Sequence, residues 1–366
     1  MGAYILRRLA LIVPTLLGIM LINFVVLQFV PGGPVEQILS EIRQGEGGAS
    51  ATDRFTGGAD AGISQSQGLG DGNAYRGSQG LEQELKDELT KQFGLDKPAW
   101  ERFGIMIWNY ARFDFGESFF RSATVIDLIV EKMPVSISLG LWATLISYLV
   151  SIPLGVAKAV RDGTPFDAIT SAIIIAAYAI PGFLFAIMLL VFFAGGTYLD
   201  WFPLRGLASD DWDTLSLGGK IVDYFWHIAL PVTAILIGSF ATLTLLTKNS
   251  FLDEIGKQYV MTARAKGLSE RRVLYGHVFR NGMLIVVAGF PGAFLFAFFG
   301  QAIFVETVFS LDGLGLLGYN AVLDRDYPVV LGTLYIFGLM GLLVKLLSDL
   351  TYVLIDPRID FEGREG

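Results

Sequence analysis

The chain has 366 residues, of which 53% are hydrophobic and only 17% are charged, against about 25% charged residues in typical globular chains. With a mean hydropathy of +0.54, this composition excludes a soluble enzyme and a disordered chain. The absence of cysteine excludes disulfides, zinc–thiolate sites and thiol nucleophiles. The two histidines, His227 and His277, stand far apart in the sequence, which disfavours a histidine-based metal site.

Six stretches of 18 or more residues contain no Asp, Glu, Lys or Arg. A helix rises about 1.5 Å per residue, so roughly 20 apolar residues cross a hydrocarbon layer about 30 Å thick. The stretches therefore predict an all-α polytopic membrane protein with six transmembrane helices, and not a β-barrel, whose strands are about 10 residues long and alternate in polarity. In chain order they are 9–35, 133–157, 168–199, 224–247, 281–305 and 327–344.

The first stretch follows Arg7 and Arg8 and has the basic start and apolar run of a signal peptide. However, it continues past Val30 into a Pro-Gly-Gly-Pro sequence without a small-x-small cleavage pattern. Its uncharged run is also too long for the apolar region of a signal peptide. We therefore predict a retained first transmembrane helix.

A large polar segment, 31–132, follows the first stretch. Its part 44–80 is rich in Gly, Ser, Gln, Ala and Asp and cannot bury a core, so we expect a mobile loop there. From Leu81 to Phe93 leucine and phenylalanine recur every four residues, which predicts an amphipathic helix that stops at Gly94. A second helix, rich in aromatic residues, is predicted to lie along the membrane interface, where Trp and Tyr are favoured: Trp100, Phe103, Ile107, Trp108 and Tyr110.

The distribution of charge among the loops predicts the orientation in the membrane. Lys and Arg in short loops mark the cytoplasmic side, and they dominate the N-terminus and the loop 248–280, whereas Asp and Glu dominate the loops 200–223 and 306–326. Both termini are therefore expected in the cytoplasm. The net charge of −8 then arises from acidic residues on the outer side.

Several short motifs imitate those of soluble enzymes. The run Gly313-x-Gly315-x-x-Gly318 lies between membrane helices rather than in a βαβ unit, so it does not indicate a dinucleotide site. Asp114-Phe-Gly116 lacks the other kinase motifs, and the phosphate-binding motif G-x-x-x-x-G-K-[ST] is absent from the sequence. Nothing in the sequence supports catalysis or metal binding by this chain.

The basic inner loop has a more specific pattern. Its first part is predicted to continue the preceding helix through Val260 to Ser269, with a break at Gly267 and a second helical run beyond it. The small residues Ala263, Ala265 and Gly267 would let another protein approach closely, with Arg264 and Lys266 beside the contact. A basic loop without a partner is the alternative that composition alone leaves open.

These residues resemble a known family. The run Tyr259-Val-Met-Thr-Ala-Arg-Ala-Lys-Gly267, with His277-Val-Phe-Arg280-Asn281 after it, is similar to the coupling loop, or EAA motif, of ABC importer permeases of the dipeptide, oligopeptide and nickel type. The sequence from Glu306 to Gly315, the run Asp326-Tyr-Pro-Val, the C-terminal region and the N-terminus agree with the same family. The insertion 44–80 resembles that of the B-type permeases of the Yej subgroup, which import oligopeptides and microcin C. Thr262 stands where the general motif has Glu, a change that the peptide subfamily shares.

The resemblance implies a type I ABC importer permease fold and assigns roles to individual residues. It implies that an ATPase contacts the coupling residues, which are Tyr259, Thr262, Ala263, Arg264, Ala265, Lys266, Gly267 and Leu268. It implies that His277, Arg280 and Asn281 anchor the loop to the helix bundle. The outer-loop residues Gly313, Gly315, Asp324, Arg325 and Asp326 would receive a solute-binding protein.

The function that follows is a permease subunit in the bacterial inner membrane, which moves peptides, including peptide antibiotics, from periplasm to cytoplasm. Its implied partners are a second homologous permease, a cytoplasmic ABC ATPase, a periplasmic peptide-binding protein and the lipid bilayer, with no nucleic acid. The chain itself would bind no cofactor and no metal, and ATP and Mg would act on the ATPase. The alternative is an ion- or proton-coupled secondary transporter, which predicts broken helices in matching halves and acidic relays within the membrane.

The predicted organisation has four parts. Residues 1–30 form the N-terminal tip and first helix, 31–132 the periplasmic segment with the insertion 44–80, 133–357 a five-helix core with the coupling loop 248–282, and 358–366 a cytoplasmic tail. In the last helix Lys345 and Asp349 stand one turn apart, a spacing that permits an ion pair. Extension of both side chains to the interface is favoured over a proton relay.

Overall fold

The structure is a computed structural model dominated by helices. Within the described residues the β structure consists of an isolated bridge between Glu117 and Thr124. The predicted insertion 44–80, the tail 358–366 and most of the helix predicted from Leu81 lie outside the described residues. Those residues are 2–29, 33, 35–36, 39, 86–87, 89–91, 95–194, 196, 198–295 and 302–355.

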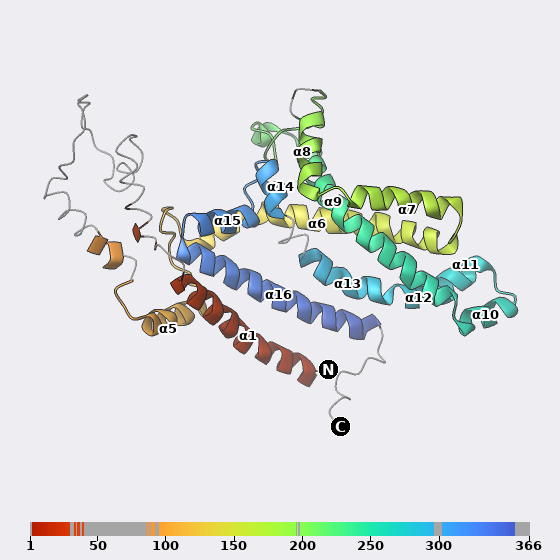
Figure 1. The fold of residues 1–366 in the computed structure, drawn as a ribbon, viewed down its shortest axis with the longest axis horizontal. Helices are drawn as coiled ribbons and strands as arrows, with labels where there is room; N and C mark the ends of the chain where they lie inside the picture. Colours follow the sequence, from red (N-terminus) through yellow and green to blue (C-terminus); the bar gives the residue numbers. More distant parts are fainter. Residues whose placement is uncertain are drawn as a thin grey trace. The chain divides into compact units, whose positions relative to one another are not determined.

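Four helices in the described residues are long and apolar enough to cross a membrane by themselves. They are α1 (Gly2–Phe29), α6 (Val125–Val160), α9 (Leu217–Ile255) and α16 (Tyr327–Ile355). Each includes most of one uncharged stretch of the sequence, which confirms four of the predicted spans (Figure 1).

The other two stretches correspond to helix pairs that are bent at a short break. The first pair, α7 (Pro165–Tyr178) and α8 (Gly182–Phe193), turns by 90°, and Pro181 stands at the break, where its ring and missing N–H do not continue a helix. The second pair, Glu270–Gly282 and α13 (Leu284–Leu295), turns by 47°. With each pair taken as one span, the described part of the chain has up to six, as predicted.

The contacts divide the chain into two compact units. Unit 1 holds 1–14, 129–319 and 336–366, and unit 2 holds 15–128 and 320–335. In unit 1 an apolar cluster joins α6, α8, α9 and α14 (Ala302–Val308), with Leu139, Ala186 and Ile235 among its most buried residues. Also in unit 1, Arg8 of α1 forms a salt bridge of 3.1 Å with Asp349 of α16.

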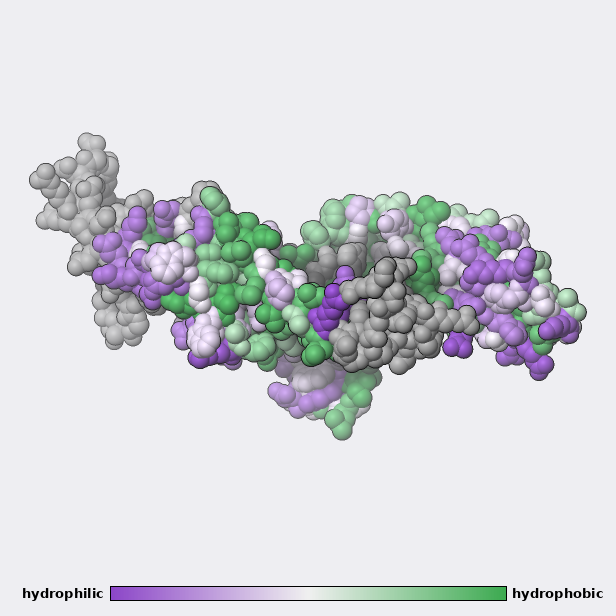
Figure 2. Space-filling model, turned by 90° about the horizontal axis from the view of Figure 1, so that it is seen from below, coloured by the Kyte–Doolittle hydropathy of each residue, from purple (hydrophilic) through white to green (hydrophobic). Residues whose placement is uncertain are grey.

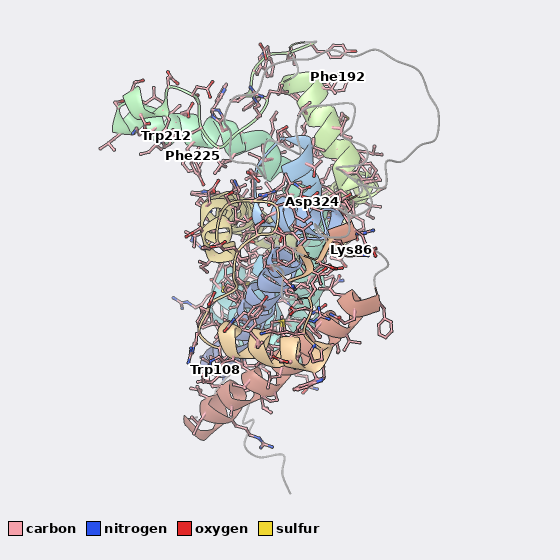
Figure 3. The ribbon with its side chains drawn as sticks, turned by 90° about the vertical axis from the view of Figure 1, so that its left-hand side faces the viewer. Lys86, Trp108, Phe192, Trp212, Phe225 and Asp324 are labelled. Carbon is pink, nitrogen blue, oxygen red and sulfur yellow. The ribbon has the colours of Figure 1, made fainter. Side chains whose placement is uncertain are left out.

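In unit 2 the predicted interfacial helix is present as α5 (Ala99–Tyr110). Trp108 is 61% exposed on this helix (Figure 3), as a residue of the membrane interface would be. The opposite face turns inward, where the Tyr110 ring packs edge-on against Phe115 and Tyr335, with centroid distances of 4.9 and 5.5 Å. The helix is therefore anchored on one face and exposes Trp108 on the other, and its position along the membrane interface stays a prediction.

Candidate functional site: a basic loop and the outer elements

The basic loop that is predicted on the inner side forms four short elements after α9. The sequence predicted one continuing helix, but α9 ends at Ile255, Gly256 caps it, and a separate helix α10 (Gln258–Ala265) follows. After Gly267 the chain resumes as α11 (Glu270–Val273), a π-helical turn η3 (Leu274–Val278) and α12 (Phe279–Gly282). Figure 1 shows α10 and α11 beyond the C-terminal end of α9, and hydrophilic residues cover this region at the right-hand end of Figure 2.

The two faces of α10 differ. Val260 and Ala263 are buried in an apolar cluster with Phe251 of α9 and Val156 of α6, so α10 is packed against its own bundle. The opposite face carries exposed residues at helical spacing: Gln258, Met261, Thr262 and Ala265. Met261 is 54% exposed although it is large and apolar. This outer face is therefore accessible to a partner.

The small residues predicted for close packing therefore have different environments. Ala263 is 7% exposed and faces the bundle, whereas Ala265 is exposed on the outer face. Gly267 has a φ of +83°, a conformation that favours glycine. Its N–H donates to the Arg264 carbonyl and the Leu268 N–H donates to the Ala263 carbonyl, which is the pattern of a Schellman C-cap.

This geometry makes Gly267 a test of the loop structure. Gly267→Val should strain the left-handed residue by about 1–2 kcal/mol, and Gly267→Asn should cost less because Asn tolerates that region. We expect trypsin to cut purified Gly267→Val at the exposed Arg264 and Lys266 about tenfold faster than wild type, because local opening becomes more frequent. Equal cleavage rates for the Val variant and wild type would contradict the capping role.

Polar contacts hold the loop to the bundle. The Tyr259 hydroxyl donates to Glu254 Oε2 at 2.7 Å, and Asn281 Nδ2 donates to the Tyr259 hydroxyl at 3.3 Å. Burial and the Glu254 hydrogen bond raise the pKa of Tyr259 above its usual value, so Tyr259 stays a neutral donor. All three predicted anchors are exposed, and one of them, Asn281, joins this network.

A buried ionic cluster that the sequence pattern did not predict lies at the ends of α6, α7 and α9. Lys158 is 0% exposed, and its Nζ donates to the Asp167 carbonyl, Thr170 Oγ1 and Ser171 Oγ and lies 2.9 Å from Asp167 Oδ1. Lys248 Nζ lies 2.7 Å from Asp167 Oδ2. Asp167 therefore joins two lysines from two other helices, a pairing that charge counts for whole loops do not reveal.

On the predicted outer side, Gly313 and Gly315 make room for a buried carboxylate. Glu306 of α14 is 0% exposed, and its oxygens accept from Ser136 Oγ at 2.9 Å and from the Leu316 N–H at 2.7 Å. A Cβ on Gly313 would lie 2.1 Å from Glu306 Oε1. The glycines thus allow Glu306 to cap α15 (Leu314–Leu323), where the helix dipole favours negative charge.

Burial raises the pKa of Glu306 above its usual value, despite the hydrogen bonds that favour the carboxylate. An acid whose pKa is higher in the folded state than in the unfolded state contributes most to stability at pH values below the unfolded-state pKa. That contribution is lost as pH rises through the folded-state pKa. We therefore expect the unfolding temperature of wild type, measured relative to that of Glu306→Gln, to fall as pH rises from about 4.5. Parallel pH profiles of the two proteins would contradict this role.

The other predicted outer residues belong to unit 2. Asp326 is 3% exposed and accepts hydrogen bonds from Ser118 Oγ and from the Phe119 N–H, so it holds the loop before α6. Burial raises the pKa of Asp326 above its usual value. Arg325 is half-buried with a φ of +56°, and Asp324 is exposed. Of these three residues, Asp324 is the most open to contact.

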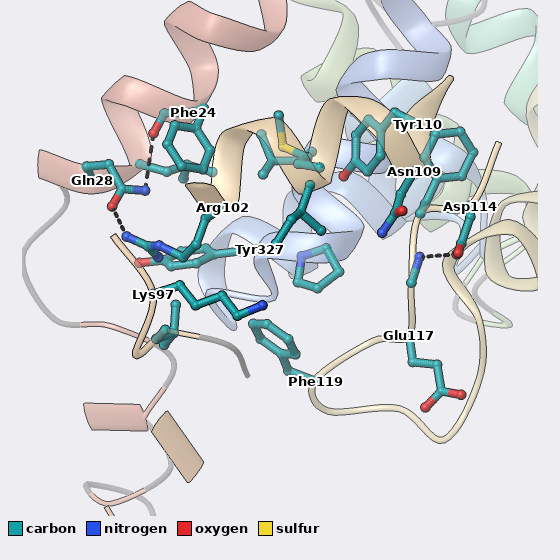
Figure 4. A pocket seen from close by; sticks show the side chains of 18 residues that line it. Phe24, Gln28, Lys97, Arg102, Asn109, Tyr110, Asp114, Glu117, Phe119 and Tyr327 are labelled. Atoms are coloured by element: carbon teal, nitrogen blue, oxygen red, sulfur yellow. Dashed lines mark hydrogen bonds between the residues drawn. The ribbon is translucent and has the colours of Figure 1, made fainter. Parts of the chain in front are cut away.

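Unit 2 also contains a pocket of about 360 Å³ between α1, α5 and the start of α16 (Figure 4). Arg102 Nη2 donates to Gln28 Oε1 at 2.6 Å at one side of it, and the Arg102 guanidinium lies 5.9 Å from the centre of the Phe24 ring. The wall is mostly apolar, with Tyr110 and Tyr327 among its side chains. Three elements far apart in the sequence form it, so the sequence pattern gave no sign of this pocket.

Comparison with known proteins supports the family resemblance. Residues 151–361 match the family described as the binding-protein-dependent transport system inner membrane component. The chain is 64% identical over its full length to the whole peptidoglycan transport system permease protein YejB of Agrobacterium fabrum. It is likewise 58% identical, end to end, to the inner membrane ABC transporter permease protein YejB of Escherichia coli O157:H7.

More distant relatives cover nearly the same length. The dipeptide transport system permease protein DppB of Escherichia coli K12 is 32% identical, over 97% of this chain and 98% of DppB. A chain of the inward-facing MetNI methionine ABC transporter has 14% identity and a TM-score of 0.48, over 63% of this chain and 97% of that one. From the family match and the full-length identities, the chain belongs to the binding-protein-dependent ABC importer permeases of the inner membrane, non-catalytic transport subunits that work with a separate ATPase and a solute-binding protein.

Proposed function

We propose that this chain is a membrane-spanning subunit of a peptide importer, in which it forms one half of the passage and a second, homologous permease forms the other. The observation that carries this proposal is the full-length identity of 64% and 58% to permeases of peptidoglycan and ABC transport systems. The dipeptide permease supports the same substrate class at greater distance.

The outer face of α10 is the proposed ATPase contact. Met261 and Ala265 offer an exposed apolar and small surface, with Thr262 between them and Lys266 at the end of the helix. The inner face, with Ala263, is packed on the bundle, so a displacement of α10 by the ATPase would carry α6 and α9 with it. Tyr259, Gly267 and Leu268 maintain the shape of the loop, and Arg264 is paired with Glu270 at 2.9 Å.

The anchors and outer residues keep the roles that the family implies, with a division suggested by the hydrogen bond of Asn281 and by the burial of the outer residues. Asn281 holds the loop through Tyr259, and His277 and Arg280 are proposed to act at its exposed surface. On the periplasmic side Gly313, Gly315 and Asp326 would shape the outer loops, and Asp324 and Arg325 would meet the binding protein.

Transport by the reconstituted importer tests the proposal. Proteoliposomes containing both permeases and the ATPase should take up a radiolabelled tripeptide only when ATP and the binding protein are both supplied. Uptake driven by a proton gradient without ATP would contradict the proposal and favour a secondary transporter.

The proposed orientation, with both termini in the cytoplasm, has a separate test. The chain contains no cysteine, so a single introduced cysteine can be labelled without background. In intact spheroplasts a membrane-impermeant maleimide should label Asp324→Cys, and it should label Ala265→Cys only after permeabilisation. The reverse pattern would invert the topology.

A further inference from the structure

Unit 1 contains a cavity of about 350 Å³ that is separate from the coupling loop and the outer loops. Three helices surround it: α6 near Thr144 and Ser147, α9 between Ile235 and Leu246, and α13 near Gly289. These positions lie near the middle of α6 and α9, so the cavity is at the depth of the membrane interior. Its volume is within the range of small-molecule sites, about 300–1,000 Å³.

Two hydroxyl groups on the wall are buried without a partner. Thr144 is 4% exposed and Ser147 is 2% exposed, and their hydroxyl oxygens have no hydrogen-bond partner among the residues that the structure describes. Threonines elsewhere in the described helices, including Thr233 and Thr247, donate to the carbonyl four residues earlier. Thr244 has a third unpartnered hydroxyl but is not on the cavity wall.

A buried hydroxyl without a partner costs about 1–3 kcal/mol, and hydrocarbon offers no water to satisfy it. Buried hydroxyls without a partner beside a cavity are placed to form hydrogen bonds with a molecule that occupies the cavity. A hydroxyl both donates and accepts, so it matches the N–H and C=O groups of an amide equally well. The residues that line the cavity include no Asp, Glu, Lys, Arg or His, so the wall would not select for the charge of a cargo side chain.

Glycine leaves space on the third helix. A Cβ on Gly292 would meet no atom within 4 Å, and one on Gly289 would meet only the Tyr148 hydroxyl at 3.9 Å. The cavity is thus open where side chains of varied size would need room, and its two buried, unpartnered hydroxyls are on another helix, α6.

We propose that this cavity is an intramembrane site for the backbone of the transported peptide, where Thr144 and Ser147 bond its amide groups. The inference rests on the proposed peptide import and adds the place and the chemistry of recognition. A peptide amide that leaves water needs a new hydrogen-bond partner. The two hydroxyls supply one without discriminating among the side chains of the peptide.

Removal of the hydroxyls with shape retained tests the site in the complete reconstituted importer. Thr144→Val with Ser147→Ala should lower ATP-driven uptake of radiolabelled trialanine and trivaline by about tenfold each, because two hydrogen bonds are lost. Gly292→Leu should lower uptake further by filling the cavity. Thr233→Val, the same change at an exposed position of α9, should transport like wild type.

Stability separates a transport defect from a folding defect. Loss of unpartnered hydroxyls should leave the unfolding temperature of the double variant unchanged or higher, and ATP hydrolysis without binding protein should stay at the wild-type rate. Wild-type uptake in both the double variant and Gly292→Leu would overturn the site, and a loss for only one of the two peptides would overturn backbone recognition. Failure of the wild-type importer to move either peptide would instead refute the proposed function.

Discussion

Replacement of Met261 and Ala265 by glutamate should reduce ATP-driven peptide uptake by about two orders of magnitude. Both side chains lie on the exposed face of α10, and a partner that covers this face would bury two unpaired carboxylates at a cost of several kcal/mol. The measurements are uptake in membrane vesicles and co-purification of the ATPase with the permease. We expect both to fall together.

A matched control separates loss of the interface from loss of the fold. Met261→Leu with Ala265→Ser keeps the volume and neutrality of the same two positions, so it should retain uptake and assembly. The glutamate variant should also reach the membrane at the wild-type level, since neither residue is in the core. Near wild-type uptake in the glutamate variant would contradict the assignment of this face to the ATPase.

The ionic cluster at Asp167 should be the most sensitive polar site for stability. Asp167→Asn keeps the shape of the side chain but leaves Lys158 buried without its carboxylate partner. Breaking a buried ion pair by removing one partner costs about 3–5 kcal/mol. We expect a marked fall in the unfolding temperature of the purified importer.

A double variant distinguishes a lost ion pair from a general disturbance. Lys158→Met added to Asp167→Asn removes the uncompensated charge, so the double variant should be more stable than Asp167→Asn alone. An unfolding temperature for Asp167→Asn equal to wild type, or a double variant that is less stable than the single one, would contradict the role of the cluster in joining α6, α7 and α9.

The spans were predictable because the thickness of the hydrocarbon layer sets a length that uncharged runs must meet. The angle of 90° between α7 and α8 was not, because both sides of Pro181 are apolar and a proline permits a kink without fixing its size. The helix end at Ile255 was missed for a related reason. An isolated glycine is tolerated inside a helical pattern, and the extended backbone at Lys257, with a ψ of 152°, is what separates α9 from α10.

For the candidate site, the position of the loop could be predicted from the sequence, but not which of its residues face the bundle and which face solvent. Ala263 and Ala265 are alike in composition, yet burial separates one as core and the other as surface. Gly267 has a positive φ, which favours glycine independently of any close packing against a partner. The ionic partners Lys158 and Asp167, and the pairing of Asp349 with Arg8 rather than with its neighbour on the same helix, depend on contacts between helices. No single-sequence pattern encodes such contacts.

Cysteine cross-linking to the ATPase tests the central claim most directly, because the chain has no cysteine of its own. Ala265→Cys and Ala263→Cys differ by two positions on α10 but lie on opposite faces. With a short thiol-reactive photo-cross-linker, Ala265→Cys should form a product with the ATPase subunit in the assembled importer, and Ala263→Cys should not. An ATPase product from Ala263→Cys alone, or from neither position, would show that the outer face of α10 does not contact the ATPase.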